Sequence, residues 1–445
     1  MKRVCSSSSL RSQRGFALLM ALWVAVLAVA ILVVVQAYGN RQAGAGQEAL
    51  AKVRAYWAAR AGVEATLARL AWNTESPDLA DAFRVMDDMV DVAEGDLGDA
   101  TYVVSHAHLR EEKDVLGPID AHAMLNIGRT SGEQLLNIPL MTEDVIAGIT
   151  DWMDDDDDVT VGGAEISQYL SNPRPYGPRN AMFRSLAEME LVNYAEQDLI
   201  RGEDWNMNFR LDPEENDRDF AWPGDNGDGV LDLGWAQYLT TASVDSWLSV
   251  EGEERLILTD ASASEISSRI EVSAEQADVI AKHVESAQTL GDFIRTPLNE
   301  LQDPETNQPI NADVEPLTTD QLVKLLDETT LADIPAGAVP GKLNINTADE
   351  EVLELIMDST AVSRVVAARD SRVGSGGWTS IVDVMEVDGF GRDVVANLYE
   401  IADIRSNVYI VPVVGRDKKS GIKVEMIATL DRSTLPVVIR ELRVR

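Results

Sequence analysis

The feature that most constrains this chain is an uncharged run of twenty residues, Phe16 to Val35. At about 1.5 Å per residue, a helix of this length spans roughly the 30 Å hydrocarbon core of a bilayer. A secretory signal has an apolar core of only about 7–15 residues and then a small-residue cleavage site. Here the run is longer, no A-x-A site closes it, and the helical pattern continues to about Trp72. We therefore predict a membrane helix that continues as a stem.

The residues before this run carry positive charge only, which holds that end of a membrane segment in the cytoplasm. The basic residues are Lys2, Arg3, Arg11 and Arg14. A basic head, then Gly15, Phe16 and an unbroken apolar helix, resembles the start of type IV prepilins and pseudopilins. The resemblance implies that a prepilin peptidase cuts between Gly15 and Phe16 and methylates the new N-terminus, so the mature protein keeps its helix. A plain single-pass anchor is the alternative interpretation.

The fifth residue after the expected cleavage point is Met20. Most members of the prepilin group carry a glutamate there, whose charge neutralises a neighbouring subunit's N-terminal amine inside the apolar filament core. A subunit at the end of the filament has no neighbouring subunit above it, and so no N-terminal amine to neutralise. An uncharged residue such as Met20 at this position is therefore consistent with a terminal subunit.

Composition limits the class of protein. With 445 residues and 45 % hydrophobic content, the chain can bury a sizeable core in roughly two or three domains. A formal net charge of −37 repels nucleic acid and anionic lipid and suits divalent cations. The single cysteine, Cys5, lies in the leader, so the mature chain has no disulfide framework. The sequence has no G-x-S-x-G elbow, Walker loop or H-E-x-x-H motif, so it offers no known catalytic motif of these kinds.

The pattern along the chain predicts an α+β protein. Residues 99–112 alternate and are rich in β-branched and aromatic side chains, which is typical of a strand, and residues 122–127 are a candidate second strand. Residues 80–96 read as a loose acidic connection. The C-terminal residues predict a hairpin or meander with its turn at 415–421 and a last strand at Val437 to Val444.

We expect a pilin-like fold, in which a long N-terminal helix packs on a small antiparallel sheet, with a large helical insertion. The predicted parts are a prepilin leader (1–15), a transmembrane and stem helix (16–72), a pilin-like strand region (73–127), a helical insertion (128–405) and C-terminal strands that complete the sheet (406–445).

The helical insertion contains weak repeats that look like SAM or helix-hairpin-helix modules. The segments that begin "LNIGRT" at Leu125 and "LNINTA" at Leu343 are similar, and residues 272–294 are a looser copy. A hairpin that grips DNA phosphate needs a Gly-x-Gly turn, and only Gly389 and Gly391 supply one. Together with the negative charge, this favours packing modules over an anchored nucleic-acid receptor.

Several motifs narrow the resemblance to family K of the minor pseudopilins of type II secretion systems. They are "RGFALLMALWVAVLAVAI", "ITDWMDDDDDVTVGGAEISQYL", "PRPYGPRNAMFRSLAEMELV" and "GKLNINTADEEVLELI". That family typically lacks the glutamate at the fifth mature position too. The resemblance implies a tip subunit in complex with minor pseudopilins I and J, which primes pseudopilus assembly for export of folded proteins across the outer membrane. It also implies an inner-membrane anchor through residues 16–35, with the bulk of the chain in the periplasm and no enzymatic role.

Two acidic loops are candidate calcium sites. The twelve-residue window from 204 to 215 has oxygen-bearing side chains at positions 1, 3, 5, 9 and 12 of an EF-hand loop: Asp204, Asn206, Asn208, Asp212 and Glu215. The backbone carbonyl of Arg210 falls at position 7, and Phe209 replaces the usual glycine at position 6. A second, shorter loop is a weaker candidate and offers Asp225, Asn226, Asp228 and Asp232. The resemblance to family K also implies calcium binding, and two solvated acidic loops are the alternative.

Two further patterns are possible metal ligands. Asp151 and the run Asp154 to Asp158 form a third acidic candidate, although a run of charges is usually a solvated loop. His106 and His108 lie two residues apart, on one face of a strand if the strand forms.

Two classes of function therefore remain open beside the nucleic-acid receptor. The first is a structural tip subunit of a secretion pseudopilus, which is cleaved after Gly15. The second is a membrane-anchored calcium-binding or adhesive envelope protein that keeps its leader and works outside a secretion system. Dependence on a prepilin peptidase separates the two.

Overall fold

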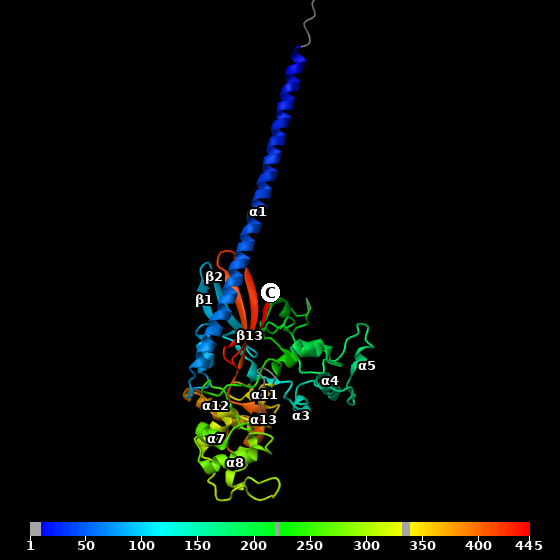
Figure 1. Cartoon of the computed structure of the whole chain (residues 1–445). Coiled ribbons are helices and arrows are strands. Elements are labelled where there is room, and N and C mark those ends of the chain that lie inside the picture. The colour runs from blue at the N-terminus through cyan, green and yellow to red at the C-terminus, as the bar shows by residue number, and fades with distance from the viewer. Residues whose placement is uncertain (1–9, 219, 221, 332–338) are drawn as a thin grey trace, which may run out of the picture.

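The structure is a computed structural model that describes residues 10–218, 220, 222–331 and 339–445, with side chains from Gly15 onward. Residues 1–9 of the predicted leader, including Cys5, lie outside the described residues. The chain forms a long projecting helix, a sheet against its C-terminal half, and a helical part beyond the sheet (Figure 1).

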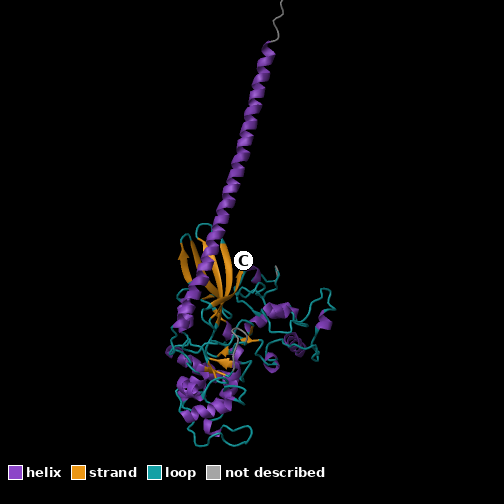
Figure 2. Cartoon of the chain, viewed as in Figure 1, coloured by secondary structure: helices purple, strands orange, loops and turns teal. Residues whose placement is uncertain are grey.

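The N-terminal helix α1 runs from Leu10 to Glu75 without a break, which confirms the long helix predicted from the sequence. Three glycines in its middle do not interrupt it, because each costs only about 1 kcal/mol in a helix interior. The part of α1 after Val35, residues 36–75, is called the stem below. Side chains from Phe16 to Val35 are all exposed, and the N-terminal half of α1 projects clear of the rest of the molecule (Figure 2).

The main sheet is antiparallel and joins the two ends of the chain. Its strand order is β1–β2–β11–β12–β13, with β3 added at β2 and β4 at β11. The strands are β1 (Glu94–Leu97), β2 (Ala100–Ala107), β3 (Asp114–Leu116), β4 (Ile119–Asp120), β11 (Val408–Asp417), β12 (Lys423–Asp431) and β13 (Val438–Val444). The strand region and the C-terminal meander therefore form one sheet, and the predicted α+β, pilin-like fold is confirmed.

The stem packs across one face of this sheet. Val63 and Leu70 of the stem lie in one buried cluster with Val411 and Val413 of β11. Ile410, which points to the opposite face of the same strand, lies in a second cluster beneath the sheet. β11 is therefore covered on both faces, which is why it is an almost continuous apolar run.

Two local predictions were wrong. Residues 80–96 are not a loose connection, since they form helix α2 (Arg84–Val90) and strand β1. The side chain of Asp81 accepts a hydrogen bond from the Phe83 N–H (2.9 Å) just before the helix, and Met89 within it is fully buried. The acidic segment therefore contains a short amphipathic helix. In residues 122–127 the chain forms a 3₁₀ turn η1 (Ala121–Ala123) and a strand of only two residues, β5 (Leu125–Asn126).

The helical part of the described chain consists of three units with one plan. Each unit begins with a two-residue strand that pairs in parallel with another at its end. The pairs are β5 with β6 (Leu239–Thr240), β7 (Leu256–Ile257) with β8 (Thr329–Thr330), and β9 (Leu343–Asn344) with β10 (Ala402–Asp403). The looser repeat predicted at 272–294 thus begins earlier, at β7.

The helices of each unit follow its first strand. The first unit contains α3 (Gly132–Leu135), α4 (Glu143–Met153), α5 (Ile166–Tyr169), η2 (Leu186–Leu191), α6 (Gln197–Arg201), η3 (Pro213–Glu215) and η4 (Gly234–Gln237). The second contains α7 (Ala263–Ile270), α8 (Ala274–Val284), α9 (Gly291–Arg295), η5 (Leu298–Glu300) and α10 (Thr319–Glu328). The third contains α11 (Glu350–Leu353), α12 (Ser359–Arg372), η6 (Val373–Ser375), η7 (Ile381–Glu386) and α13 (Arg392–Ile401).

The repeated "LNI" motif has the same local chemistry in the first and third units. Asn126 accepts a hydrogen bond from the Gly128 N–H and donates to the carbonyl oxygen of Ser243, just beyond β6. Asn344 accepts from the Asn346 N–H and donates to the hydroxyl of Ser406, just beyond β10. The asparagine therefore closes each unit by joining its first strand to the segment that leaves it.

Candidate metal centre

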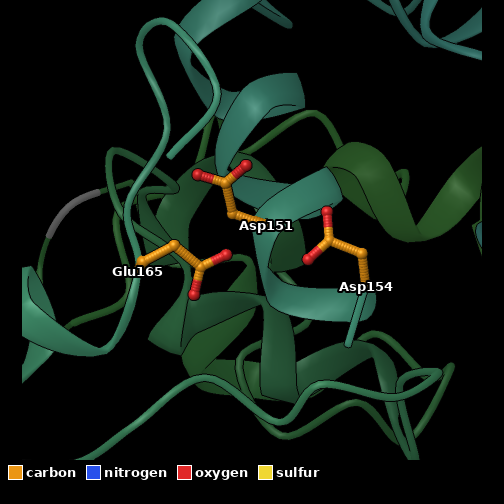
Figure 3. Close-up of side chains that lie close together, drawn as sticks. All are labelled: Asp151, Asp154 and Glu165. Atoms are coloured by element: carbon orange, nitrogen blue, oxygen red, sulfur yellow. The ribbon is translucent and has the colours of Figure 1, made fainter. Parts of the chain in front are cut away.

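Three carboxylates converge where α4 ends and α5 begins (Figure 3). Asp151 lies in the last turn of α4, Asp154 follows that helix, and Glu165 precedes α5. One carboxylate oxygen from each lies within 4.8 Å of the others. Asp151 is 0 % and Glu165 is 1 % exposed, so this set, called the acidic cluster below, is mostly buried.

The local sequence explains why Asp151 points inward. The hydroxyl of Thr142 caps α4 by accepting a hydrogen bond from the Val145 N–H (3.3 Å). Asp151 lies four residues after Ala147, and both are buried on the same side of α4, against the returning chain at Gly163. Asp151 therefore points into the protein.

The loop after α4 folds back onto Asp151. The Thr160 N–H donates to both oxygens of Asp151 at 3.2 Å. A side chain at Gly163 would overlap the Asp151 carboxylate, and Gly162 has φ +91°, which favours glycine. The glycine pair is therefore what lets the loop close on the carboxylate and bring Glu165 beside it.

No basic side chain among the described residues forms an ion pair with the acidic cluster. Both Glu165 oxygens and Asp154 Oδ1 are buried and have no hydrogen-bond partner among the described residues. Burial, and then the charges of Asp151 and Asp154, raise the pKa of Glu165 to about 7. Burial and neighbouring aspartates also raise the pKa of Asp154. Such oxygens are costly to bury unless they bind a proton or a hard cation.

The aspartate run predicted from the sequence thus divides into two parts. Asp154 turns inward, whereas Asp155 to Asp158 are exposed. The structure adds Glu165, which sequence reasoning did not single out. The signal available in the sequence was the glycine pair directly before "AE", which allows a close return to the end of α4.

The first acidic loop, Asp204 to Glu215, closes tightly around Asp204. The two oxygens of Asp204 accept hydrogen bonds from the N–H groups of Asn208 (2.9 Å) and Phe209 (2.8 Å). Phe209 has φ +61°, so it adopts the left-handed conformation for which an EF-hand loop uses glycine at this position. The sharp turn therefore forms without the glycine.

The side chains of the first acidic loop are only partly satisfied. The amides of Asn206 (2.7 Å) and Asn208 (3.0 Å) donate to Asp212 Oδ2, while Asn206 Oδ1 is buried without a partner among the described residues. Burial raises the pKa of Asp204 to about 6 and that of Glu215 to about 7. The guanidinium of Arg210 points away and donates to Ser105.

The second acidic loop, Asp225 to Asp232, is organised around Glu203, which sequence reasoning did not single out. Glu203 is buried and accepts hydrogen bonds from the N–H groups of Asn226 (2.8 Å) and Asp232 (3.3 Å). Burial raises its pKa. Asn226, Asp228 and Asp232 each accept a hydrogen bond, at 2.8 Å, from the N–H two residues further on. These side chains therefore have local roles as turn formers.

The remaining sequence candidates lie elsewhere. His106 Nδ1 lies 3.1 Å from the Ala107 carbonyl oxygen, and His108 Nδ1 accepts from the Arg110 N–H (3.0 Å), so both rings contact the backbone. Gly15, Phe16 and Met20 are exposed on α1, and the start of that helix lies far from α4 and α5 (Figure 1).

Among the described residues, one helix is long and apolar enough to cross a membrane. It covers Gly15–Glu75, and none of its most apolar window is buried in the protein. This agrees with the single membrane helix predicted from the sequence.

Comparison with known proteins finds a family match within the first unit of the helical part. Residues 133–202, which include all three members of the acidic cluster, match the family model for type II secretion system (T2SS) protein K. A chain of the solved GspK–GspI–GspJ complex from the type 2 secretion system of enterotoxigenic Escherichia coli is similar, with 12 % identity and a TM-score of 0.44 over 91 % of this chain and 99 % of that one. No curated protein sequence matches this chain.

Proposed function

We propose that this chain acts as a minor pseudopilin at the tip of the secretion pseudopilus, because its residues 133–202 match the family model for type II secretion system protein K. There it primes pseudopilus assembly together with other minor pseudopilins, for export of folded proteins across the outer membrane. Its role is structural rather than catalytic. The family match is the observation that carries this proposal.

The N-terminal helix supports the proposal. Gly15 and Phe16 stand where the uncharged, exposed stretch of α1 begins, which fits the junction that a prepilin peptidase cuts, and Met20 leaves the start of that stretch without a charge. Residues 16–35 would hold the protein in the inner membrane, with the sheet and helical units in the periplasm.

The shape of the molecule supports a place at the tip. The helical units extend below the sheet and to one side of it, well beyond the width of the stem (Figure 1). A filament packs its subunits helix against helix, so a subunit with such a body fits at the end of the filament better than within it.

The stem offers a surface for the proposed partners, minor pseudopilins I and J. Leu50, Val53 and Trp57 follow one another at spacings of three and four residues and are 50, 52 and 57 % exposed. Residues at this spacing lie on one face of a helix. An exposed apolar stripe of this kind is suited to packing against the stem helices of other pseudopilins.

We further propose that the protein binds calcium. The acidic cluster fits a hard cation, because its three carboxylates are held together without a protein cation and three of their oxygens lack hydrogen-bond partners among the described residues. The first acidic loop is a second position, where Asn206 Oδ1 and Glu215 are the groups best able to ligate. The second acidic loop fits less well, since the oxygens of Asn226, Asp228 and Asp232 already accept backbone N–H groups.

Intact mass and N-terminal sequencing of the membrane-extracted protein test the pseudopilin proposal. The expected result is a chain that starts at methylated Phe16 when a prepilin peptidase is present and at Met1 when it is absent. Gly15→Leu should block the cut, while Gly39→Leu, at an exposed position further along α1, should not. An uncleaved chain in a host with the peptidase would overturn the proposal and leave a membrane-anchored calcium-binding or adhesive envelope protein.

A further inference from the structure

A small polar cavity of about 40 Å³ lies where the C-terminal end of α1 meets the helical units. Its walls come from four separate parts of the chain: the end of α1 with Asn73 and Thr74, the loop 245–252 with Arg255, residues 403–407 before β11, and Arg432 directly after β12. At roughly 10–15 Å³ for each bound water, it has room for about three or four waters or for one small ion.

The walls of the cavity are fixed by contacts outside it. The Trp247 N–H donates to the Ser433 carbonyl oxygen (3.1 Å), and the Asn407 side-chain amide donates to the Val244 carbonyl oxygen (3.2 Å). Gly252 has φ +83°, and a side chain there would come within 2.7 Å of the Thr74 carbonyl oxygen. The loop therefore needs glycine in order to close over the end of α1.

Four polar atoms on the residues that line this cavity are buried without a hydrogen-bond partner among the described residues. They are Asn73 Nδ2, Ser249 Oγ, Arg255 Nε and Arg432 Nη1. Asn73 is only 3 % and Ser249 only 7 % exposed. The three nitrogens can only donate, and a serine hydroxyl can donate as well, so the missing partner is an acceptor.

The charges around the cavity favour an anion over water. Arg255, Arg405 and Arg432 line it together with only two carboxylates, Asp245 and Asp403. The C-terminal end of α1 adds roughly half a negative charge. The balance is about half a positive charge, which suits one monovalent anion and not a sulfate or a phosphate.

Two of the three arginines lack a carboxylate partner of their own. Arg405 pairs with Asp327 (3.3 Å), whereas Arg255 and Arg432 form no close ion pair with any described residue, although the charge of nearby Asp245 raises the pKa of Arg255. Asp245 pairs instead with Arg129 (3.4 Å). Burial and the charge of Arg405 lower the pKa of Arg432, as expected for a cation without a counter-ion.

We propose that this cavity binds one small monovalent anion of the size of chloride. The anion accepts hydrogen bonds from the stem through Asn73, from the loop 245–252 through Ser249, and from the strand end through Arg432. It thereby ties the end of the stem to the helical units. The inference does not depend on the proposed function.

The test compares salts on the full-length protein in mild detergent with EGTA present. Sodium chloride, in place of sodium gluconate at equal ionic strength, should raise the unfolding midpoint by roughly 3–5 °C when chloride is about a hundredfold above its Kd. Crystals soaked in sodium bromide should show an anomalous peak within hydrogen-bond distance of Asn73 Nδ2 and Arg432 Nη1.

Variants connect the effect to the cavity. Arg432→Gln should abolish the chloride response, and Ser249→Ala, which removes one uncharged donor and should fold normally, should weaken chloride binding several-fold. Arg364→Gln is the control: it removes an arginine on α12 that contacts Asp388 and does not line the cavity. Its unfolding midpoint should rise with chloride as much as that of the wild type. Equal midpoints in the two salts, a response that Ser249→Ala keeps in full, or bromide bound only elsewhere would overturn the proposal in favour of bound water.

Discussion

The acidic cluster predicts that Glu165→Gln changes stability in opposite directions with and without calcium. Without a cation, the Glu165 carboxylate is buried next to Asp151 and Asp154 and is repelled by them. Replacing it with the neutral, isosteric glutamine removes that repulsion and should stabilise the protein. With calcium present, the same change removes a ligand and should destabilise the bound state.

The size of the first effect follows from the pKa of Glu165, which rises from 4.5 to about 7. At 1.36 kcal/mol per pKa unit, the charged form costs the folded state roughly 3 kcal/mol as an upper bound. The exposed loop Asp155 to Asp158 keeps water close to the cluster, which screens the repulsion. We therefore expect Glu165→Gln to stabilise the calcium-free protein by about 1–2 kcal/mol at pH 8.

The sign of the pH dependence follows from the same shift. A carboxyl whose pKa is raised on folding stabilises the folded state fully below its unfolded pKa, and that stabilisation is lost as the pH rises through its folded pKa. In EGTA, the wild type should therefore lose stability between about pH 4.5 and pH 7. Glu165→Gln should lack this part of the pH profile.

The second effect depends on calcium concentration. At a hundred times the Kd, a ligand that binds only the folded state stabilises it by about 2.7 kcal/mol. The wild type should gain this amount on addition of calcium, and Glu165→Gln should gain much less. The variant should thus be the more stable protein in EGTA and the less stable one in calcium.

Urea unfolding of the full-length chain in mild detergent measures both effects. The total fluorescence of the nine tryptophans follows the unfolding, and it includes Trp152, whose ring lies in the aromatic group beside the cluster, 5.4 Å from the ring of Tyr169. Asp158→Asn removes a charge from the exposed part of the same loop and is the matched control. An equal loss of stability in EGTA and in calcium would refute the reasoning, since Glu165 would then be an ordinary structural residue.

Three further predictions concern other parts of the molecule. Gly415→Ala should lower stability by about 3 kcal/mol or more in a denaturant titration, because the new methyl group would overlap the carbonyl oxygen of Ala55 where the stem crosses β11. The control is Gly391→Ala, at a position with open space around it, which should lower stability far less. Trp57→Ala should change the stability of the isolated protein by less than about 0.5 kcal/mol, since the side chain is 57 % exposed. It should nevertheless weaken co-purification with minor pseudopilins at least tenfold. If the variant recovers as much minor pseudopilin as the wild type does, the exposed stripe on the stem is not the partner surface. Burial raises the pKa of Asp327 from 3.8 to about 6 despite its pairing with Arg405, so the stabilisation from its protonated form is lost as the pH rises through 6. Asp327→Asn should therefore remove roughly 1–3 kcal/mol of the change in unfolding free energy between about pH 4 and pH 7. An unaltered pH profile of stability would contradict the shift.

The parts of the fold that could be predicted are those with a long, single-period pattern. The apolar run and its continuation predicted α1, and alternation predicted β2 and the C-terminal strands. Helix α2 was missed because its apolar positions lie among aspartates that suggest a loop. β3 and β4 were missed because strands of two or three residues carry no period of their own and exist only through their pairing partners.

The acidic cluster could be predicted only in part. Asp151 and Asp154 lie three residues apart, as expected for two groups at one end of a helix, and the charge run drew attention to them. Glu165 comes from eleven residues further on, and it is brought back only because Gly162 and Gly163 allow the loop to touch the Asp151 carboxylate. Charge density was therefore a poor guide, since most of the dense run faces solvent.

The two acidic loops show why spacing alone does not distinguish a calcium site from a turn. An aspartate or asparagine that could ligate an ion at alternate positions can equally accept the N–H two residues further on, because both uses need the same oxygen and the same backbone curvature. In the second acidic loop, Asn226, Asp228 and Asp232 all accept a backbone N–H and act as turn formers. In the first acidic loop only some side chains do so, and Asn206 Oδ1 is buried without a partner among the described residues. What separates the two uses is thus an unsatisfied buried oxygen, and by that criterion the acidic cluster, with three such oxygens, is the strongest candidate for a cation site in the described chain.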